Sequence, residues 1–138
     1  MSSKAEKGRT VKRVLFVCVE NSNRSQMAEA FARMLGGEQV DVHSAGSKPS
    51  GRVNPCAIES MKEISYDLST HRSKALSAIP QGGYDAVVSM GCGDACPFVP
   101  AKLREEWEIP DPKEMEPEDF RRVRGLIRDK VKDLLARL

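Results

Sequence analysis

The sequence predicts an α/β fold: a single domain in which a four-stranded parallel sheet is flanked by helices. Two observations lead to this prediction. Short aliphatic runs alternate along the chain with longer stretches of helical periodicity, which is the pattern of strand–helix–strand units. The length of 138 residues suits one domain with a sizeable core, and no repeat, low-complexity tract or linker divides it. We expect that domain to span residues 12–138, after a disordered basic leader at residues 1–11.

The first strand and helix are predicted from a buried-type run and from the pattern that follows it. Residues 14–17 (VLFV) form a continuous β-prone run, as expected for a strand that is buried on both faces. Residues 25–35 then place apolar side chains at helical spacing, and two glycines end the helix. The apolar stripe of this helix consists of Met27, Phe31, Met34 and Leu35.

In the middle of the chain, helix-capping and helix-breaking residues indicate where elements begin and end. Residues 40–44 are a second strand candidate. Asn54 and Pro55 supply an N-cap and a first helical position for a helix that continues to about residue 64. A short third helix is predicted at residues 73–79, before a proline and two glycines.

Two further strands and a long helix complete the prediction. Residues 86–90 form a third buried strand, and a weak fourth strand is placed near residues 107–109. Pro117 opens the last helix, whose acidic first turn suits the positive end of a helix dipole. The buried stripe of this helix consists of Phe120, Val123, Ile127, Val131, Leu134 and Leu138.

Charge and hydropathy narrow the classes of function. The formal net charge is +2, which indicates neither a nucleic-acid nor a membrane partner, and no apolar run could span a bilayer or form a signal-peptide core. We therefore expect a cytoplasmic protein, with a monomer as the default. Because that compartment is reducing, the four cysteines are expected to be catalytic, redox-active or metal-binding rather than static disulfides.

The segment CVENSNR, from Cys18 to Arg24, links the first strand to the first helix. Backbone N–H groups in such a loop, with the helix N-terminus, form a cradle for a tetrahedral oxyanion, and Arg24 adds a planar fork. The same positive field favours a thiolate, so we expect a lowered pKa for Cys18. The spacing alone would also fit a buried cysteine and a surface arginine. The position after a buried strand favours the oxyanion site, at the sheet edge where Cys92 also follows a strand.

The sequence CVENSNRS resembles the phosphate-binding loop of low-molecular-weight tyrosine phosphatases and of the arsenate reductases that share their fold. The QMAE that follows is similar to the reductase branch, because the phosphatase branch usually has proline where Gln26 stands. The resemblance covers the chain from residue 13 through HSAGS, NP-AIESMKEI, LSTHRSK, GCGDACP and PDP. It implies a low-molecular-weight phosphotyrosine phosphatase-like fold with Cys18 as nucleophile. Oxyanion binding and loop support are assigned to Glu20, Asn21, Ser22, Asn23, Ser25 and Ser44.

Cys92 and Cys96 lie together in MGCGDACPFVP. A structural zinc site needs about four ligands, and the two histidines have no metal-like spacing, so we expect no metal. Two unrelated loop thiols are the other alternative. The resemblance to thioredoxin-coupled arsenate reductases implies instead that both are redox partners of Cys18. It also implies arsenate as substrate, phosphate or sulfate as competing oxyanions, thioredoxin as the electron donor, and no cofactor. Cys56 matches no role in the family, and we expect it to be packed or half-exposed.

Asp111 stands between two prolines, which stiffen the turn. By itself it would be an ordinary turn aspartate. In the related enzymes an Asp-Pro pair on a loop over the oxyanion site supplies the general acid, and the resemblance gives that role to Asp111. Protonating a leaving oxygen requires a pKa that is raised by burial and by neighbouring anionic charge.

Three positions depart from the family pattern. Lys74 stands where some relatives have an aspartate at a potassium site to which Glu29 also belongs, so we expect no potassium requirement. Glu20 replaces a common glycine and places a carboxylate next to the anion cradle. Asn23 replaces a cysteine that many relatives have.

Two other functions stay open from the sequence. A low-molecular-weight tyrosine phosphatase would use the same loop and acid. A non-enzymatic oxyanion-binding or redox-sensing module would have no need of Asp111. Within the reductase interpretation, glutaredoxin with glutathione, or another low-molecular-weight thiol, is an alternative donor.

Overall fold

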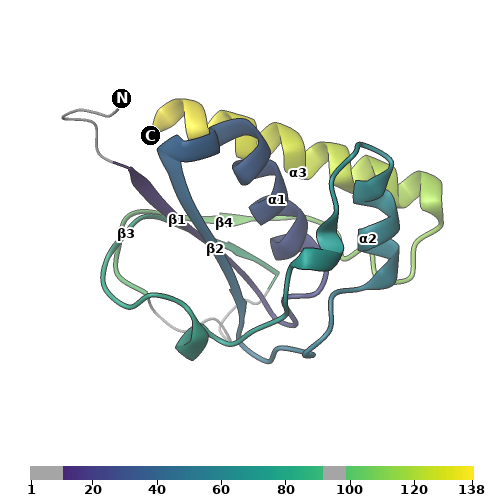
Figure 1. Cartoon of the computed structure of the whole chain (residues 1–138), viewed down its shortest axis with the longest axis horizontal. Helices are drawn as coiled ribbons and strands as arrows, with labels where there is room; N and C mark the ends of the chain where they lie inside the picture. The colour runs from purple at the N-terminus through teal and green to yellow at the C-terminus, as the bar shows by residue number, and fades with distance from the viewer. Residues whose placement is uncertain (1–10, 92–98) are drawn as a thin grey trace.

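The computed structural model describes residues 11–91 and 99–138, and within these ranges four strands form one parallel sheet (Figure 1). The spatial order is β2-β1-β3-β4. The strands are β1 (Lys12–Cys18), β2 (Val40–Gly46), β3 (Tyr84–Met90) and β4 (Ala101–Trp107). The chain runs outward from β1 to β2 and later returns to β3 on the other side of β1. The carboxyl ends of β1 and β3 therefore flank the topological switch point, where ligands bind in open α/β sheets.

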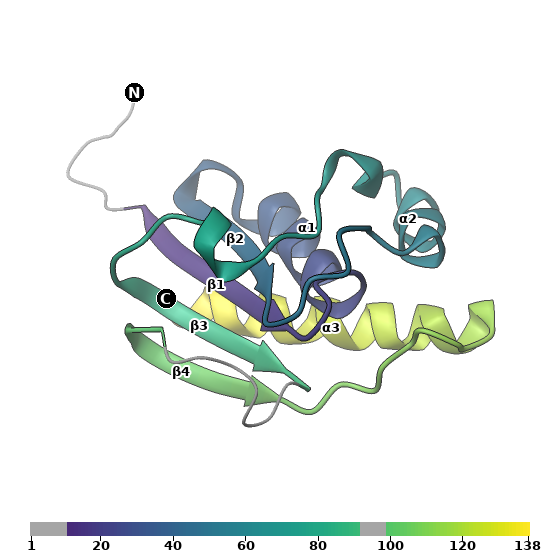
Figure 2. The ribbon, with the colours of Figure 1, turned by 90° about the horizontal axis from the view of Figure 1, so that it is seen from below.

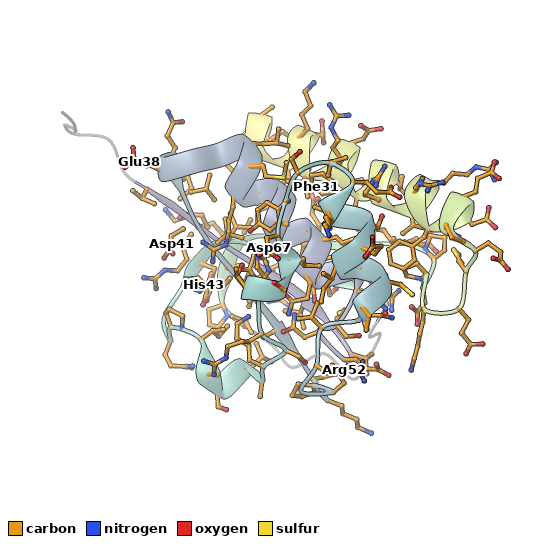
Figure 3. The ribbon with its side chains drawn as sticks, turned by 45° about the vertical axis from the view of Figure 1, so that its right-hand side comes forward. Phe31, Glu38, Asp41, His43, Arg52 and Asp67 are labelled. Atoms are coloured by element: carbon orange, nitrogen blue, oxygen red, sulfur yellow. The ribbon has the colours of Figure 1, made fainter. Side chains whose placement is uncertain are left out.

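Helices cover one face of the sheet (Figures 1 and 2). They are α1 (Arg24–Gly36), α2 (Pro55–Lys62) and the long α3 (Pro117–Arg137). Their apolar side chains join Val14 and Phe16 of β1 and Ala86 and Val88 of β3 in the larger of two apolar clusters. Figure 3 shows Phe31 of α1 within this helical layer, whereas Glu38 and Arg52 lie at the periphery.

The opposite face of the sheet is covered by connecting segments and not by an α-helix in the described ranges. Leu15 and Val17 of β1 pack there with Ala45, Ile79 and Tyr84. Alternate residues of β1 thus enter two different clusters. The prediction of a strand buried on both faces is confirmed, and with it the α/β class.

The helix predicted at residues 73–79 is wrong: a single 3-10 turn, η3 (Leu76–Ala78), lies there instead. The reason is that the backbone before it is already paired. The Lys74 N–H donates to the Asn21 side chain at 3.0 Å, and the Lys74 carbonyl accepts from the Gly46 N–H at 2.8 Å. Ala75 then forms a parallel bridge with Gly46, which holds this segment extended beside β2.

The fourth strand lies at Ala101–Trp107, earlier than the predicted position near residues 107–109. It is an edge strand whose side chains alternate between half-buried and exposed until the buried Trp107. Charged residues occupy the exposed positions, so the segment lacks the continuous apolar run that marks a central strand.

The apolar stripe of α1 is shorter than predicted. Met27 and Phe31 are buried, but Met34 and Leu35 remain 45% and 46% exposed in the last turn. In α3 the predicted stripe is buried from Phe120 to Leu134, and Leu138 packs against the core only in part. In residues 11–91 and 99–138 we find no helix with both the length and the hydropathy of a membrane span. The predicted leader at 1–11 lies almost entirely outside the described residues.

Candidate active site

The loop between β1 and α1 is anchored to the segment at residues 47–54 through its backbone carbonyl groups. The Cys18, Val19, Glu20 and Ser22 carbonyls accept hydrogen bonds of 2.8–3.2 Å from backbone N–H groups of residues 47–54. Since the carbonyl and N–H of a peptide unit point in opposite directions, this arrangement turns loop N–H groups toward the other side. Such a concave row of N–H groups at a helix start is suited to an oxyanion.

Two backbone features allow the loop to close tightly. Asn21 has a φ of 50°, in the left-handed region that asparagine tolerates better than most residues. Gly46 ends β2 directly beneath the loop, and a Cβ there would lie 2.6 Å from the Val19 carbonyl oxygen. Glycine at this position therefore permits the close approach of β2 to the loop.

Cys18 is the last residue of β1 and is almost fully buried. Its Sγ lies 2.9 Å from Ser25 Oγ, and Ser25 Oγ accepts a hydrogen bond of 2.7 Å from Asn21 Nδ2. The orientation of the Asn21 amide is fixed, because its Oδ1 accepts from the Lys74 backbone N–H at 3.0 Å, a group that can only donate. Ser25 is thus free to donate its own proton to the Cys18 sulfur.

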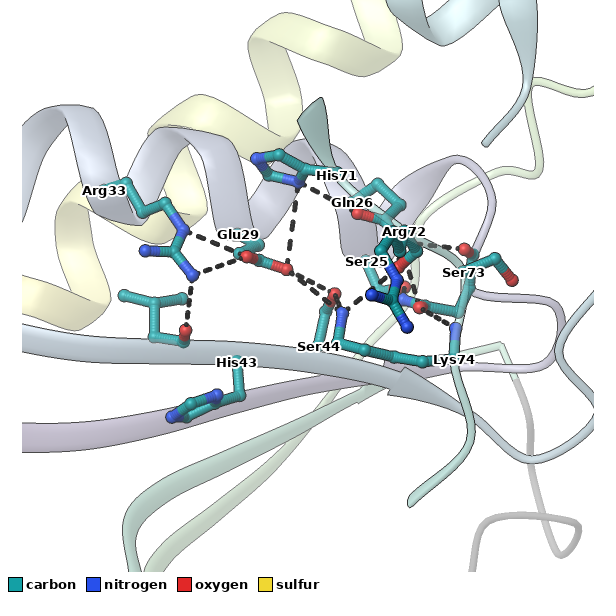
Figure 4. A network of polar contacts seen from close by, with 12 residues as sticks. Ser25, Gln26, Glu29, Arg33, His43, Ser44, His71, Arg72, Ser73 and Lys74 are labelled. Atoms are coloured by element: carbon teal, nitrogen blue, oxygen red, sulfur yellow. Dashed lines mark hydrogen bonds and ion pairs between the residues drawn. The ribbon is translucent and has the colours of Figure 1, made fainter. Parts of the chain in front are cut away.

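Gln26 extends this network away from the loop (Figure 4). Its Nε2 donates to the Asn21 backbone oxygen at 3.0 Å and to the Arg72 carbonyl at 2.8 Å. Its Oε1 therefore faces His71 Nδ1 at 3.0 Å, and that nitrogen must carry the proton. The other ring nitrogen of His71 then accepts from the Tyr66 hydroxyl at 2.7 Å.

His71 is held as the neutral imidazole. Burial lowers its pKa from the ordinary value of 6.5, and the cations Arg33 and Lys74 act in the same direction, against the opposing effect of Glu29. This position gives His71 a structural role, since its ring contacts Gln26 and Tyr66.

A buried carboxylate lies next to this network. Glu29 accepts from the Ser44 hydroxyl at 2.5 Å and from Arg33 at 2.8 and 2.9 Å, and the Lys74 ammonium lies 3.8 Å from it (Figure 4). Burial alone would raise the pKa of Glu29, but the Ser44 hydrogen bond and the neighbouring cations hold it below 4.5. Ser44 is thereby tied to a helix residue, and the Lys74 ammonium also reaches Ser44 Oγ at 3.4 Å.

Arg24 connects three parts of the site. Its Nη1 donates to the Ile109 carbonyl at 2.9 Å, and its Nη2 lies 4.0 Å from Asp111 Oδ2. Gly91 lies against the guanidinium, since a Cβ there would be 2.4 Å from Nη1. Gly91 also has a φ of 74°, so a larger residue would be disfavoured by both backbone and contact.

Asp111 approaches the loop from the segment after β4. The expected burial of this acid is wrong, because its side chain is 55% exposed and its charged neighbour is the Arg24 guanidinium. Its Oδ1 accepts from the Lys113 N–H at 3.1 Å. The Lys113 ammonium lies 3.3 Å from Glu20 Oε2. The structure thus brings Asp111 to within 4.0 Å of Arg24, which lies 87 residues earlier in the sequence.

Among the described residues, the side chains of the other predicted site residues form no hydrogen bond or ion pair with the side chains of Cys18, Arg24 or Asp111. Ser22 and Asn23 are buried in the loop, but Asn23 does not cap α1, and its Oδ1 has no hydrogen-bond partner in the part of the chain that the structure describes. Cys56 is exposed in the first turn of α2, not packed. Cys92 and Cys96 lie outside the described residues.

Three contributors were not assigned a role from the sequence. The sequence marks Gln26 only as a feature of the reductase branch, and it indicates no role for Gly91 or Lys113. The structure shows that Gln26 is fully buried, and a buried polar side chain needs hydrogen-bond partners.

Comparisons with known proteins agree with this geometry. The family model of the low molecular weight phosphotyrosine protein phosphatase matches residues 13–138. A protein of Synechocystis sp. named glutaredoxin arsenate reductase is 40% identical over 131 residues, which cover 93% of this chain and 99% of the relative.

Two solved structures are similar over most of this chain. One is an arsenate reductase in the phosphate binding state, with a TM-score of 0.82 and 38% identity over 92% of this chain and 98% of that one. The other is a thioredoxin-dependent arsenate reductase of Corynebacterium glutamicum, with a TM-score of 0.73 and 33% identity over 96% of this chain and 66% of that one.

The neutral state of His71 predicts a pH dependence of stability. In the unfolded chain His71 takes up a proton near its ordinary pKa of 6.5, whereas in the folded chain the pKa is lower. The free energy of unfolding should therefore fall as the pH drops below about 6.5, because the unfolded state binds more protons. Urea unfolding between pH 8 and pH 5 measures this slope, and His71→Gln should flatten it. An equal slope in both proteins would contradict the assignment.

Proposed function

We propose that this chain, an enzyme that belongs to the low molecular weight phosphotyrosine protein phosphatase family, reduces arsenate to arsenite through a relay of three cysteines. The observation that carries the proposal is the Cys18–Ser25 contact at the base of an anion-binding loop, with Arg24 and Asp111 beside it. Relatives along nearly the whole chain are named arsenate reductases, which supports the same reaction.

Arsenate is a tetrahedral oxyanion, and it would bind in the loop between β1 and α1. The loop N–H groups and the helix N-terminus supply hydrogen bonds, and Arg24, whose side chain is 12% exposed, supplies a positive charge. Phosphate and sulfate have the same shape and similar charge, so both should compete. The similar arsenate reductase solved in a phosphate binding state supports this expectation.

The first chemical step joins sulfur to arsenic. The Cys18 thiolate attacks arsenic, and an arsenate oxygen leaves as water after Asp111 protonates it. Arg24 lies 4.0 Å from Asp111 and can stabilise charge that develops on the oxyanion. The arsenic is still pentavalent at this stage.

The second step is the reduction. The Cys92 thiolate attacks the Cys18 sulfur, a disulfide bond forms, and the sulfur–arsenic bond breaks with its electron pair on arsenic. Arsenite leaves, having gained the two electrons that the thiols lost. Cys96 then attacks the Cys92 sulfur, which releases the Cys18 thiolate and leaves a Cys92–Cys96 disulfide.

Thioredoxin is the proposed donor that reduces this last disulfide, because a dithiol can exchange directly with an intramolecular pair. The similarity to a thioredoxin-dependent reductase supports it, and the similarity to a glutaredoxin arsenate reductase favours glutaredoxin as the second candidate. Both donors work in the reducing cytoplasm, which is the proposed location. We propose no metal or organic cofactor, and a monomer.

A tyrosine phosphatase activity is the second candidate function, because the family carries that name and an aryl phosphate could use the same loop and acid. Hydrolysis requires Cys18 and water but no second thiol. The presence of Cys92 and Cys96 is therefore what favours the reductase.

Replacing Cys92 separates the two activities. Cys92→Ser should abolish arsenate turnover, since no thiol then attacks the Cys18 sulfur, and should leave any aryl phosphate hydrolysis unchanged. Both rates are measured on one preparation, with Cys56→Ser as the matched cysteine control. Arsenate turnover that survives in Cys92→Ser would contradict the relay.

The donor is identified by arsenate-dependent NADPH oxidation in two coupled systems. We expect turnover with thioredoxin and thioredoxin reductase. This turnover should be lost in Cys96→Ser, because the Cys92–Cys96 disulfide can then no longer form. Turnover only with glutaredoxin, glutathione and glutathione reductase would assign the other donor and remove the proposed role of Cys96.

A further inference from the structure

We propose that Glu20 and Lys113 form an ion-pair clasp with two effects on the site. The clasp ties the oxyanion loop to the segment that carries Asp111, and it neutralises a carboxylate that would otherwise repel the bound anion. This inference rests on the function proposed above, and it assigns positioning roles to two residues that the mechanism does not use.

The clasp joins two parts of the chain that are 93 residues apart in sequence. Glu20 Oε2 and Lys113 Nζ lie 3.3 Å apart, and both side chains are partly exposed. Glu20 belongs to the loop between Cys18 and Arg24, and Lys113 follows Asp111 by two residues. The ion pair therefore bridges the nucleophile's loop and the proposed acid's segment.

Both residues of the clasp make further hydrogen bonds through their backbone groups. The Glu20 carbonyl accepts from the Ser73 hydroxyl at 2.8 Å and from the Ser50 N–H at 3.1 Å. The Lys113 N–H donates to Asp111 Oδ1 at 3.1 Å. The hydrogen bonds of the Glu20 carbonyl limit where its carboxylate can lie, and Lys113 belongs to the same turn as Asp111. The clasp therefore constrains the position of Asp111.

The clasp is a link that makes no use of Arg24. A second connection to this segment runs from Arg24 to the Ile109 carbonyl and to Asp111. A bound oxyanion would recruit the Arg24 guanidinium, and some of its donors would then turn from the acid segment toward the substrate. The Glu20–Lys113 pair can hold the segment in that state.

The charge of Glu20 gives the pair its second effect. A carboxylate in an anion-binding loop lowers the local potential, and the interaction is screened only partly over distances below about 8 Å at physiological salt. The Lys113 ammonium cancels this charge. Removing the two members should therefore affect anion binding in opposite directions, which a general loss of structure would not produce.

Phosphate binding tests the neutralising effect without any redox chemistry. Calorimetric titration with inorganic phosphate at low salt should give an affinity about threefold to tenfold weaker for Lys113→Met, because Glu20 is left unpaired. Glu20→Gln should bind phosphate as well as the unchanged chain or better, and the double variant should return to that level. These differences should shrink at high salt.

The tethering effect has a different signature. Either single change cuts the clasp, so both should accelerate amide hydrogen exchange in residues 109–115 and lower kcat for arsenate about twofold to tenfold through the position of Asp111. The matched control is Lys102→Met, which removes a lysine paired with Asp85 at 3.6 Å in β3 and β4. This control should change neither quantity.

Three results would overturn the clasp. One is a weakened phosphate affinity in Lys113→Met that Glu20→Gln does not restore, since Lys113 would then contact the anion itself. The second is unchanged phosphate affinity in both single variants. The third is unchanged exchange in residues 109–115. Failure of the proposed function is distinct: the unchanged chain would bind phosphate and show the same variant pattern but would not reduce arsenate.

Discussion

The orientation of the Asn21 side chain is the constraint on which the site depends. A backbone N–H from Lys74, 53 residues away, fixes which end of this amide accepts and which end donates. The donating end then satisfies Ser25, and Ser25 is left to donate to the Cys18 sulfur. With the amide reversed, the Asn21 NH2 group would face the Lys74 N–H, so two donors would meet. Ser25 would then donate to Asn21 and no longer to the Cys18 sulfur. One peptide group outside the loop thus fixes the direction of the hydrogen bonds that lead to the Cys18 sulfur.

That peptide is in position because of the sheet. The segment before η3 runs beside β2 through the bridge between Gly46 and Ala75, which brings Lys74 under the loop. The same residue places its ammonium near the buried Glu29, where Arg33 of α1 is the second cation. A buried carboxylate without such partners would be strongly destabilising. The packing of β2, α1 and the loop is therefore coupled through charges as well as through the apolar core.

The sequence predicts those parts of the molecule that depend on local pattern. The run at residues 14–17, the helix after it and the long last helix have clear periodicities, and Cys18 with Arg24 stands at a recognisable strand–helix junction. The edge strand β4 was misplaced because its charged, exposed positions hide its pairing with β3. The prediction of a helix at 73–79 was wrong because the Lys74 backbone N–H and carbonyl are hydrogen-bonded to Asn21 and Gly46, which lie far away in the chain.

Contacts between distant segments are what the sequence does not reveal. The contact between Gln26 and His71 spans 45 residues, and the one between Glu20 and Lys113 spans 93. Nothing in the spacing of these residues indicates that they meet. Asp111 could be assigned only through resemblance, since an aspartate in a proline turn is common, and its proximity to Arg24 is a property of the folded chain alone.

A single turnover without any external donor tests the central claim most directly. The fully reduced protein is mixed with excess arsenate, and the arsenite released and the free thiols remaining are counted per chain. Because the reduction takes two electrons and one disulfide supplies two, we expect about one arsenite per chain and the loss of two thiols, with the disulfide mapped to Cys92 and Cys96. Absence of arsenite, or arsenite formed while all four thiols remain free, would contradict the relay of three cysteines.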